Sequence, residues 1–307
     1  MNILFTSSTP FHPLRGGVGR VTDTLCKELQ KRGYQVFYLN ADWVAEERKK
    51  YKYPAPVTIL PIKNIDDAQC VISYRKYLTE NKIDVVINQD ALYVDFYNNV
   101  GDLPIKVISV IHNNPLMNYN HLLNDLLTLR NNSLLERMKR IVRCLLYLRV
   151  KKQLKEYIDK RFGNIILSSD KILMLSPYYV QSLKNFGISV ENKFDYVYNP
   201  NSFPLQTSLF KKKKEIIYVG RLDNRSKKVG RLIKVWSKVG KKYPDWNLTI
   251  VGDGPDRNQL EVLKKKYQVG NLTFEGFQSP IEYYKRASIT SNPQPIGFRG
   301  NLLVKRQ

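Results

Sequence analysis

The segment EIIYVGRLDNRSKK, residues 215–228, indicates the fold of this chain. Glu215–Val219 has the apolar composition of a buried strand, Gly220 opens a polar turn, and Val229–Lys241 carries apolar residues at helical spacing. The same order of strand and helix recurs twice more, at Asn247–Val251 with Arg257–Tyr267 and at Leu272–Phe274 with Pro280–Ala287. Such alternation predicts a parallel sheet with helices on its faces.

The first two thirds of the chain repeat this pattern. Gly19–Arg32 places Val21, Leu25 and Leu29 on one face and is predicted to be a helix. Short buried strands are predicted at Asn2–Ser8, Tyr34–Leu39, Val57–Ile62, Val85–Asn88, Lys106–Ile111 and Lys171–Leu175. The sequence therefore predicts an α/β protein of two doubly wound, Rossmann-like domains that face a ligand cleft at the carboxyl ends of their strands.

An irregular stretch separates the two halves. It follows Asn199-Pro200 and contains Pro204 and the charge run Lys211–Lys214. Prolines and clustered like charges disfavour regular structure, so residues 204–214 are predicted to be a linker. The predicted domains are residues 1–203 and 215–307.

Composition narrows the class of protein. The chain has 307 residues, 43% of them hydrophobic, which is typical of a globular protein. Its three cysteines are scattered and are interpreted as reduced thiols of a cytoplasmic protein, and no apolar run approaches the roughly 18 residues that span a bilayer. The net charge of +23 calls for an acidic partner, with nucleic acid, anionic lipid and phosphorylated substrates all open on charge alone.

A basic amphipathic helix is predicted within the first domain, at residues 130–161. This stretch holds eleven Lys/Arg and three Asp/Glu, with apolar residues at helical spacing. The pattern is typical of a helix on an anionic membrane surface; the alternative is a helix that packs on its own domain with solvated charges. The residues expected to contact the membrane are Arg137, Lys139, Arg140, Arg143, Arg149, Lys151 and Lys152.

Three loops at predicted strand ends are candidates for chemistry. Gly16-Gly17 lies between the first strand and the first helix, where backbone amides can hold a phosphate, although the third glycine of the dinucleotide fingerprint is replaced by Thr22. Arg221 and Lys227 are two cations on one loop, and such a pair can neutralise a diphosphate. Gly252 and Gly254 form a third turn that allows a close backbone approach. Taken singly, each of these loops is also compatible with a purely structural turn.

Together with Ile111-His112-Asn113, these loops occur in an order that resembles glycosyltransferase family 4, whose members have the GT-B fold. The resemblance rests on Gly16–Arg20, on Val219–Asp223 with Lys227, on Val251–Pro255 and on Phe274–Phe277. It implies a retaining, metal-independent transfer from a UDP- or GDP-sugar, which is a substrate rather than a cofactor. Arg221 and Lys227 are then expected to hold the diphosphate, with Gly16 and Gly17 near the same phosphates.

The resemblance also assigns the sugar and the base. His112 is expected beside the transferred sugar and counts with Arg221 and Lys227 as catalytic, although from sequence alone it is equally a core histidine. Gly252, Gly254 and Phe277 are expected near the ribose and base. No metal site is expected, because the chain has no Asp-x-Asp pair, and the diphosphate is expected to be stabilised by cations and a helix N-terminus instead.

One part of the family pattern is missing. Two glutamates eight positions apart are expected after a strand near Ser288, but the last acidic residue is Glu282. The second domain is therefore expected to be incomplete, and an inactive remnant is the alternative to an active transferase.

The expected acceptor is a lipid-linked or surface-polysaccharide glycan at the inner face of the cytoplasmic membrane. Nucleic acid is not expected as a partner, because the sequence has no helix-turn-helix, zinc finger or basic sheet with interleaved aromatics.

Overall fold

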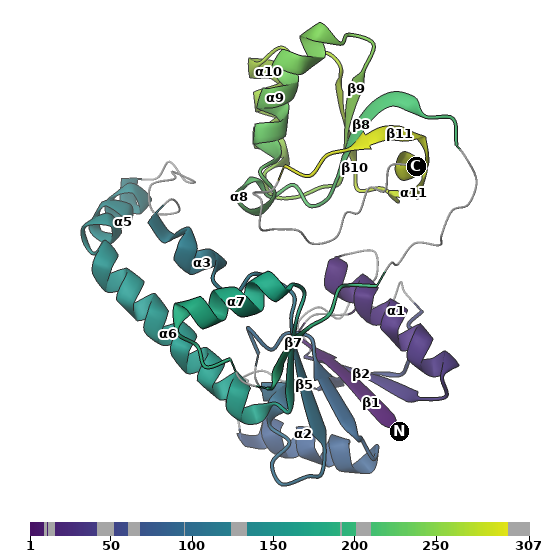
Figure 1. Ribbon diagram of the computed structural model, residues 1–307, viewed down its shortest axis with the longest axis vertical. Helices are drawn as coiled ribbons and strands as arrows, with labels where there is room; N and C mark the ends of the chain where they lie inside the picture. The colour runs from purple at the N-terminus through teal and green to yellow at the C-terminus, as the bar shows by residue number, and fades with distance from the viewer. Residues whose placement is uncertain are drawn as a thin grey trace. The chain divides into compact units, whose positions relative to one another are not determined.

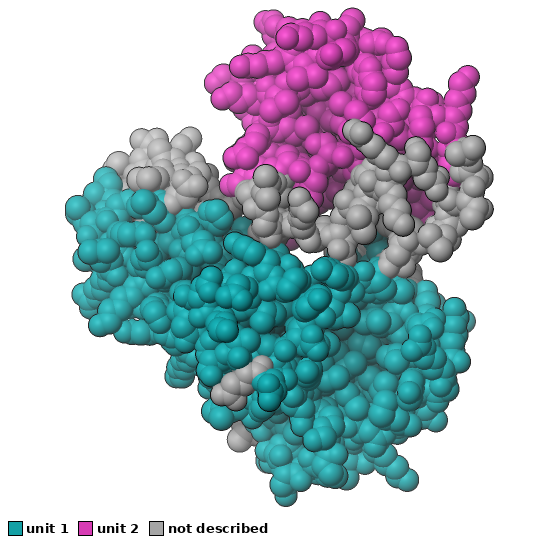
Figure 2. All heavy atoms as spheres, viewed as in Figure 1, with its two compact units in different colours: residues 1–202 teal, residues 203–307 magenta. Residues whose placement is uncertain are grey.

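A computed structural model of the chain describes residues 1–8, 11, 16–41, 52–60, 68–94, 96–123, 134–190, 192–200 and 210–293. The chain divides into two compact units, residues 1–202 and 203–307 (Figure 2). Both are built on parallel sheets, so the predicted α/β class is confirmed.

Unit 1 contains a seven-stranded sheet in the order β3-β2-β1-β4-β5-β6-β7 (Figure 1). Its strands are β1 (Asn2–Ser7), β2 (Gln35–Ala41), β3 (Val57–Leu60), β4 (Val85–Asn88), β5 (Lys106–Ile111), β6 (Lys171–Met174) and β7 (Phe194–Tyr196). Its helices are α1 (Gly17–Lys31), α2 (Ala68–Glu80), the 3-10 turn η2 (Phe96–Asn98), α3 (Met117–Asn120), α5 (Leu134–Leu145), α6 (Tyr147–Ser168) and α7 (Pro177–Phe186).

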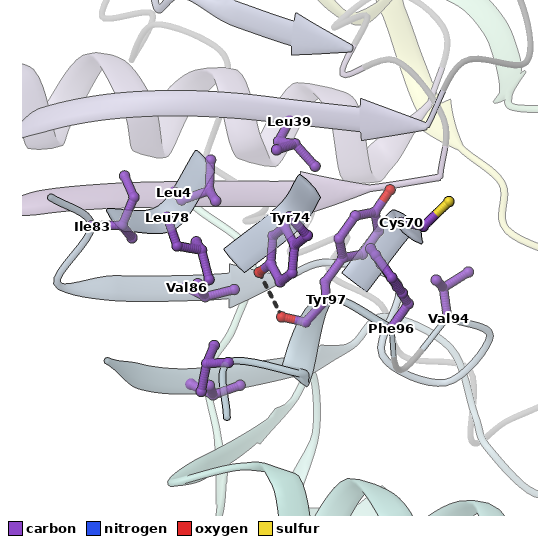
Figure 3. Close-up of a cluster of buried hydrophobic side chains, with 12 residues drawn as sticks. Leu4, Leu39, Cys70, Tyr74, Leu78, Ile83, Val86, Val94, Phe96 and Tyr97 are labelled. Carbon is purple, nitrogen blue, oxygen red and sulfur yellow. Dashed lines mark hydrogen bonds between the residues drawn. The ribbon is translucent and has the colours of Figure 1, made fainter. Parts of the chain in front are cut away.

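Strand β1 explains why the sheet is covered on both faces. Its side chains alternate, so Leu4 packs with Tyr74 of α2, while Ile3 and Phe5 pack with Cys26 of α1. Figure 3 shows the α2 side, where the Tyr74 hydroxyl donates to the Tyr97 carbonyl at 2.7 Å. A central strand that is apolar on both faces cannot be exposed on either, which is why helices cover both.

Unit 2 contains a four-stranded parallel sheet in the order β10-β9-β8-β11. Its elements are β8 (Lys213–Val219), α8 (Asn224–Lys227), α9 (Val229–Lys242), β9 (Asn247–Val251), α10 (Arg257–Lys266), β10 (Leu272–Gly276), α11 (Ile281–Arg286) and β11 (Ala287–Thr290). Ile233 and Trp236 of α9 and Leu260 of α10 share one core with the sheet, and α11 lies on its other side (Figure 1).

Two expectations need correction. The single helix predicted over residues 130–161 is two helices, α5 and α6, which part at Leu146 (φ −93°, ψ 15°); α6 also continues to Ser168, because Ile158, Phe162 and Ile165 are buried against the sheet. Residues 130–133 lie outside the described residues. Lys213 and Lys214, which fall in the predicted linker, belong to β8, where Lys213 pairs with Ala287 of β11.

Candidate functional site

Each sheet has one point where the order of its strands reverses. In unit 1 this point lies between β1 and β4, and in unit 2 between β8 and β11. Ligands of open α/β sheets bind outside the carboxyl ends of the strands at such points. Arg221 follows the carboxyl end of β8, Gly16-Gly17 lies between β1 and α1, and His112 follows β5, one strand beyond the reversal in unit 1.

The loop after β8 carries two cations without partners. The Arg221 side chain is exposed, and neither its guanidinium nor the Lys227 ammonium forms a hydrogen bond or ion pair with any residue in the described ranges. Lys227 is half-buried, and this burial lowers the pKa of its ammonium, an effect that nearby Asp223 opposes. A desolvated cation with no partner is unfavourable by itself and is stabilised by a bound anion.

Backbone and side-chain hydrogen bonds fix the position of this loop. Leu222 N–H donates to the Asp253 carbonyl at 2.9 Å, and Asn224 N–H donates to Asp256 Oδ2 at 2.7 Å. The Asn224 Oδ1 in turn accepts from Gly230 N–H at 2.8 Å and so caps α9. Between them Lys228 adopts the left-handed conformation (φ 55°, ψ 32°), which is strained for a residue with a side chain. The backbone of the turn that carries both cations is thus held by hydrogen bonds.

The structure gives Gly252 and Gly254 a packing role. A Cβ on Gly252 would lie 2.0 Å from the Gly220 carbonyl oxygen, and one on Gly254 would lie 2.6 Å from the Leu222 carbonyl oxygen. Gly252 N–H also donates to Gly276 O at 2.7 Å. These glycines allow the loops after β8, β9 and β10 to pack on one another, which is a structural reason for them independent of any ligand.

The remaining residues predicted to bind the donor lie at the surfaces of their own units. Gly16 and Gly17 stand at the start of α1 and are exposed, and no atom of the described residues lies within 4 Å of the position a Cβ would take on either. Thr22, where a third glycine was missing, is buried and donates through Oγ1 to the Val18 carbonyl at 2.9 Å. Phe277 follows β10 with 60% of its surface exposed.

His112 lies beside a small cavity of about 30 Å³ at the carboxyl end of β5. Its Nε2 lies 2.5 Å from Gln89 Oε1. Burial lowers the pKa of His112 to about 4, although the charge of Asp90 acts in the opposite direction. His112 is therefore a neutral imidazole near pH 7.

Sequence reasoning missed Asp90 and Gln89. The Asp90 carboxylate accepts hydrogen bonds from the Ser7 hydroxyl (2.8 Å) and from the Ser8 backbone N–H (2.8 Å) and hydroxyl (2.5 Å), and so ties the end of β1 to the end of β4. The signal in the sequence is the polar run Asn88-Gln89-Asp90 directly after a buried strand.

The basic residues predicted to contact a membrane differ in their exposure and in their contacts. Arg143 and Arg149 are exposed, as is Lys139. The Lys151 ammonium lies over the rings of Tyr119 (5.2 Å) and Tyr147 (5.7 Å), so it contributes to packing against α3. Lys152 pairs with Glu156 at 3.9 Å. The side chains of Arg137 and Arg140 lie outside those described.

Helix α5 exposes its apolar face. Five apolar side chains of this helix are half to four-fifths exposed: Leu135 62%, Met138 58%, Ile141 61%, Val142 53% and Leu145 81%. Contiguous exposed apolar surface often marks an interaction site. We call these five residues the α5 apolar face.

Two further observations concern the described part of the chain. It contains no group of three or more His, Cys, Asp or Glu residues placed to hold a metal ion. None of the helices in these ranges has the length and apolar character needed to cross a membrane.

Comparison with known proteins identifies the family. Residues 15–200 match the family described as Glycosyltransferase Family 4, and residues 203–294 match Glycosyl transferases group 1. The chain is 26% identical to the uncharacterized glycosyltransferase MJ1059 of Methanocaldococcus jannaschii over 220 residues, which cover 69% of this chain and 50% of the relative. It is 32% identical to the amylovoran biosynthesis glycosyltransferase AmsD of Erwinia amylovora over 106 residues, 34% of this chain and 28% of the relative.

The chain thus spans half or less of these curated relatives. Among solved structures, Alr3699/HepE of Anabaena in complex with UDP and glucose is similar in fold, with a TM-score of 0.64, 13% identity, and coverage of 96% of this chain and 74% of that one. The two sheets have the architecture expected of the GT-B fold, and the match to residues 15–200 covers more than half of the sequence. The chain therefore belongs to glycosyltransferase family 4.

Proposed function

We propose that this protein transfers a sugar from a UDP- or GDP-sugar to a lipid-linked or surface-polysaccharide acceptor, with retention at the anomeric carbon and without a metal ion. The observation that carries the proposal is the pair of cations on the loop after β8. Arg221 and Lys227 are two positive charges of that loop whose side chains have no hydrogen-bond or ion-pair partner among the described residues, and they lie next to the strand reversal of unit 2.

Sugar transfer requires charge stabilisation at the leaving group. The bond between the anomeric carbon and the diphosphate oxygen breaks, and a bond to the acceptor oxygen forms. The proton of the acceptor hydroxyl passes to the leaving phosphate. Negative charge grows on the diphosphate during this step, and preorganised cations in a partly desolvated site stabilise it. Lys227, half-buried and unpaired, has this property.

Two features of unit 1 complete the proposal. The exposed N-terminus of α1 at Gly16-Gly17 offers backbone amides and a positive helix dipole, both suited to a phosphate. His112 is proposed to contact the transferred sugar. As a neutral imidazole it adds no positive charge beside an anomeric carbon that itself becomes positive.

The α5 apolar face supports a membrane-bound acceptor. Arg143 and Lys139 flank exposed apolar residues on a short helix, an arrangement that suits a helix lying in the interface of an anionic bilayer. The name of AmsD, an amylovoran biosynthesis enzyme, supports a polysaccharide acceptor, and the UDP and glucose bound to HepE support a uridine nucleotide.

Titration calorimetry with UDP and with GDP tests the donor site. We expect Arg221→Ala and Lys227→Ala each to weaken binding by about 1.5–3 kcal/mol, because each removes a charge-assisted hydrogen bond. Lys238→Ala is the matched control, since it removes an exposed charge from α9 of the same unit and is expected to change affinity less than about twofold. Wild-type affinity in both loop variants would remove the loop from the donor site.

A further inference from the structure

Gln89 makes a contact that the proposed chemistry has not yet used. It follows β4, is 3% exposed, and presents Oε1 at 2.5 Å from Nε2 of His112, which follows the neighbouring strand β5. An amide oxygen only accepts hydrogen bonds, so the Nε2 of His112 carries the proton. Within the described residues the other ring nitrogen, Nδ1, has no hydrogen-bond partner.

We propose that Gln89 is a positioning residue that locks His112 in the Nε2–H tautomer, leaving Nδ1 as the hydrogen-bond acceptor offered to a hydroxyl of the bound sugar. This inference rests on the proposed function and specifies the role of His112 within it. The backbone supports the arrangement, because Gln89 N–H donates to the Thr6 carbonyl at 3.0 Å and Asn88 Oδ1 accepts from Asp90 N–H at 3.0 Å. The backbone that carries the Gln89 side chain is thus held in place by hydrogen bonds.

The tautomer matters because the two ring nitrogens have opposite roles. A neutral ring with Nε2–H can only accept at Nδ1, and an imidazolium can only donate there. Protonation would turn an acceptor for a sugar hydroxyl into a donor and would place a positive charge near the anomeric carbon. Burial opposes that protonation.

The surroundings of His112 contain two other titratable groups. Asp90 and Tyr93 line the same cavity, and of these Asp90 raises the pKa of His112 against the larger effect of burial. The Asp90 carboxylate is occupied by Ser7 and Ser8. Gln89, as a neutral acceptor, therefore holds the ring without favouring its charged form, which a carboxylate at the same position would do.

Long-range proton–nitrogen NMR spectra of protein labelled in its three histidines test the tautomer directly. A His112→Gln variant identifies the signal of His112. In the wild-type protein we expect a protonated Nε2 and an unprotonated Nδ1 from pH 8 down to about 5, since the pKa of His112 is about 4. An Nδ1–H tautomer, or a rapid mixture of the two, would overturn the proposal without any variant.

Two substitutions extend the test. Gln89→Met keeps the volume but removes the acceptor, so the His112 signals should shift toward a mixture of tautomers. Gln89→Glu keeps an acceptor but adds a negative charge, so it should raise the pKa of His112 by about 1 or more. Gln181→Glu on the exposed face of α7 is the control and should leave the pKa of His112 unchanged.

The pH profile of sugar transfer distinguishes a positioning role of Gln89 from a purely structural one. Gln89→Met should lower kcat on the order of 10- to 100-fold at every pH, with a smaller change in KM for the donor. Gln89→Glu should retain activity at alkaline pH and lose it as the pH falls through the raised pKa of His112. An acid limb that stays at the wild-type pH in Gln89→Glu contradicts the proposal. Because the NMR measurement needs no turnover, an inactive wild-type protein would count against the proposed function and not against the tautomer.

Discussion

At the scale of single residues, two glycines of the family motif in unit 2 are required for packing of the loops. Gly252 has a φ of 138°, and its Cα faces the Gly220 carbonyl so closely that no side chain fits. Gly254 meets the Leu222 backbone in the same way. Three loop backbones therefore lie in contact, and Arg221 projects from the first of them. The position of the cation depends on glycines that need not touch the donor.

Gly252→Ala tests this dependence. We expect it to destabilise unit 2 by roughly 2–4 kcal/mol, since the new Cβ combines an unfavourable φ with a backbone clash. Gly270→Ala, with open space around the new Cβ, is the matched control and should change stability by less than about 0.5 kcal/mol. Urea unfolding monitored by circular dichroism measures both. Equal stability of the two variants would mean that the loops separate easily, and the packing reason would be wrong.

At the scale of elements, an ion pair between the buried Glu215 and the part-exposed Arg286 attaches α11 and β11 to the rest of unit 2. Arg286, the last residue of α11, donates from Nε to Glu215 Oε2 at 2.8 Å and from Nη2 to Oε1 at 3.0 Å. Glu215, whose side chain is 7% exposed, also accepts from the Thr249 hydroxyl at 2.6 Å. The pair joins α11 to β8 and β9, next to the β8–β11 pairing that creates the strand reversal.

Arg286→Ala should destabilise unit 2 by about 2 kcal/mol. It leaves the buried Glu215 carboxylate with one neutral donor, and the part-exposed position of Arg286 reduces the cost below that of a fully buried pair. Lys214→Ala, which breaks the exposed pair with Asp245, is the control and should change stability far less, because solvent screens that pair. An equal loss of stability in the two variants would show that the Arg286–Glu215 pair stabilises unit 2 no more than a surface ion pair does.

The pH dependence of the same pair has a definite sign. Burial alone raises the pKa of Glu215, but the bonds from Arg286 and Thr249 outweigh it and the pKa is lowered. A lowered folded-state pKa means that the stabilisation is complete above the unfolded value of 4.5 and is lost as the pH falls through the folded value. The wild-type advantage over Arg286→Ala should therefore shrink below pH 4.5, and a constant difference down to pH 3 would contradict this.

At the scale of the whole molecule, the proposed membrane contact combines net charge with exposed apolar surface. The net charge is +23, and the α5 apolar face is bordered by exposed cations. Electrostatic attraction acts over about 10 Å at 0.1 M salt, whereas apolar insertion needs contact and does not depend on salt in this way. Adsorption by charge and insertion by the α5 apolar face can therefore be separated.

Liposome sedimentation measures the two contributions. The wild-type protein should bind vesicles containing anionic lipid and not neutral ones, and binding should weaken as salt is raised to about 0.5 M. Leu145→Ser, which leaves every charge in place, should weaken binding about 10- to 100-fold, because burying a leucine side chain contributes about 1.5–3 kcal/mol. Leu167→Ser is the matched control, since Leu167 on α6 is 84% exposed and lies outside the α5 apolar face. Equal binding to anionic and neutral vesicles would contradict the electrostatic part, and a wild-type result for Leu145→Ser would contradict insertion.

Much of the fold could be predicted, because short apolar runs in the sequence coincide with the buried strands of the structure. The predicted strands at Val85–Asn88, Lys106–Ile111 and Asn247–Val251 are confirmed at their stated bounds. Strand β7, by contrast, has an Asp and a Tyr exposed at an edge and gives no apolar pattern to recognise. The break at Leu146 also left no sequence signal, because neither glycine nor proline occurs there.

The sequence by itself determined the alternation of strands and helices, the family motifs and the cations Arg221 and Lys227, because these depend on residue type and spacing along the chain. Only the tertiary structure decided that Asp90 binds Ser7 and Ser8, that Gln89 meets His112, and that Lys151 lies over aromatic rings. It also turned the α5 apolar face outward. The physical reason is that parallel strands bring their carboxyl ends together across dozens of residues, and a contact set by strand order cannot be read from local periodicity.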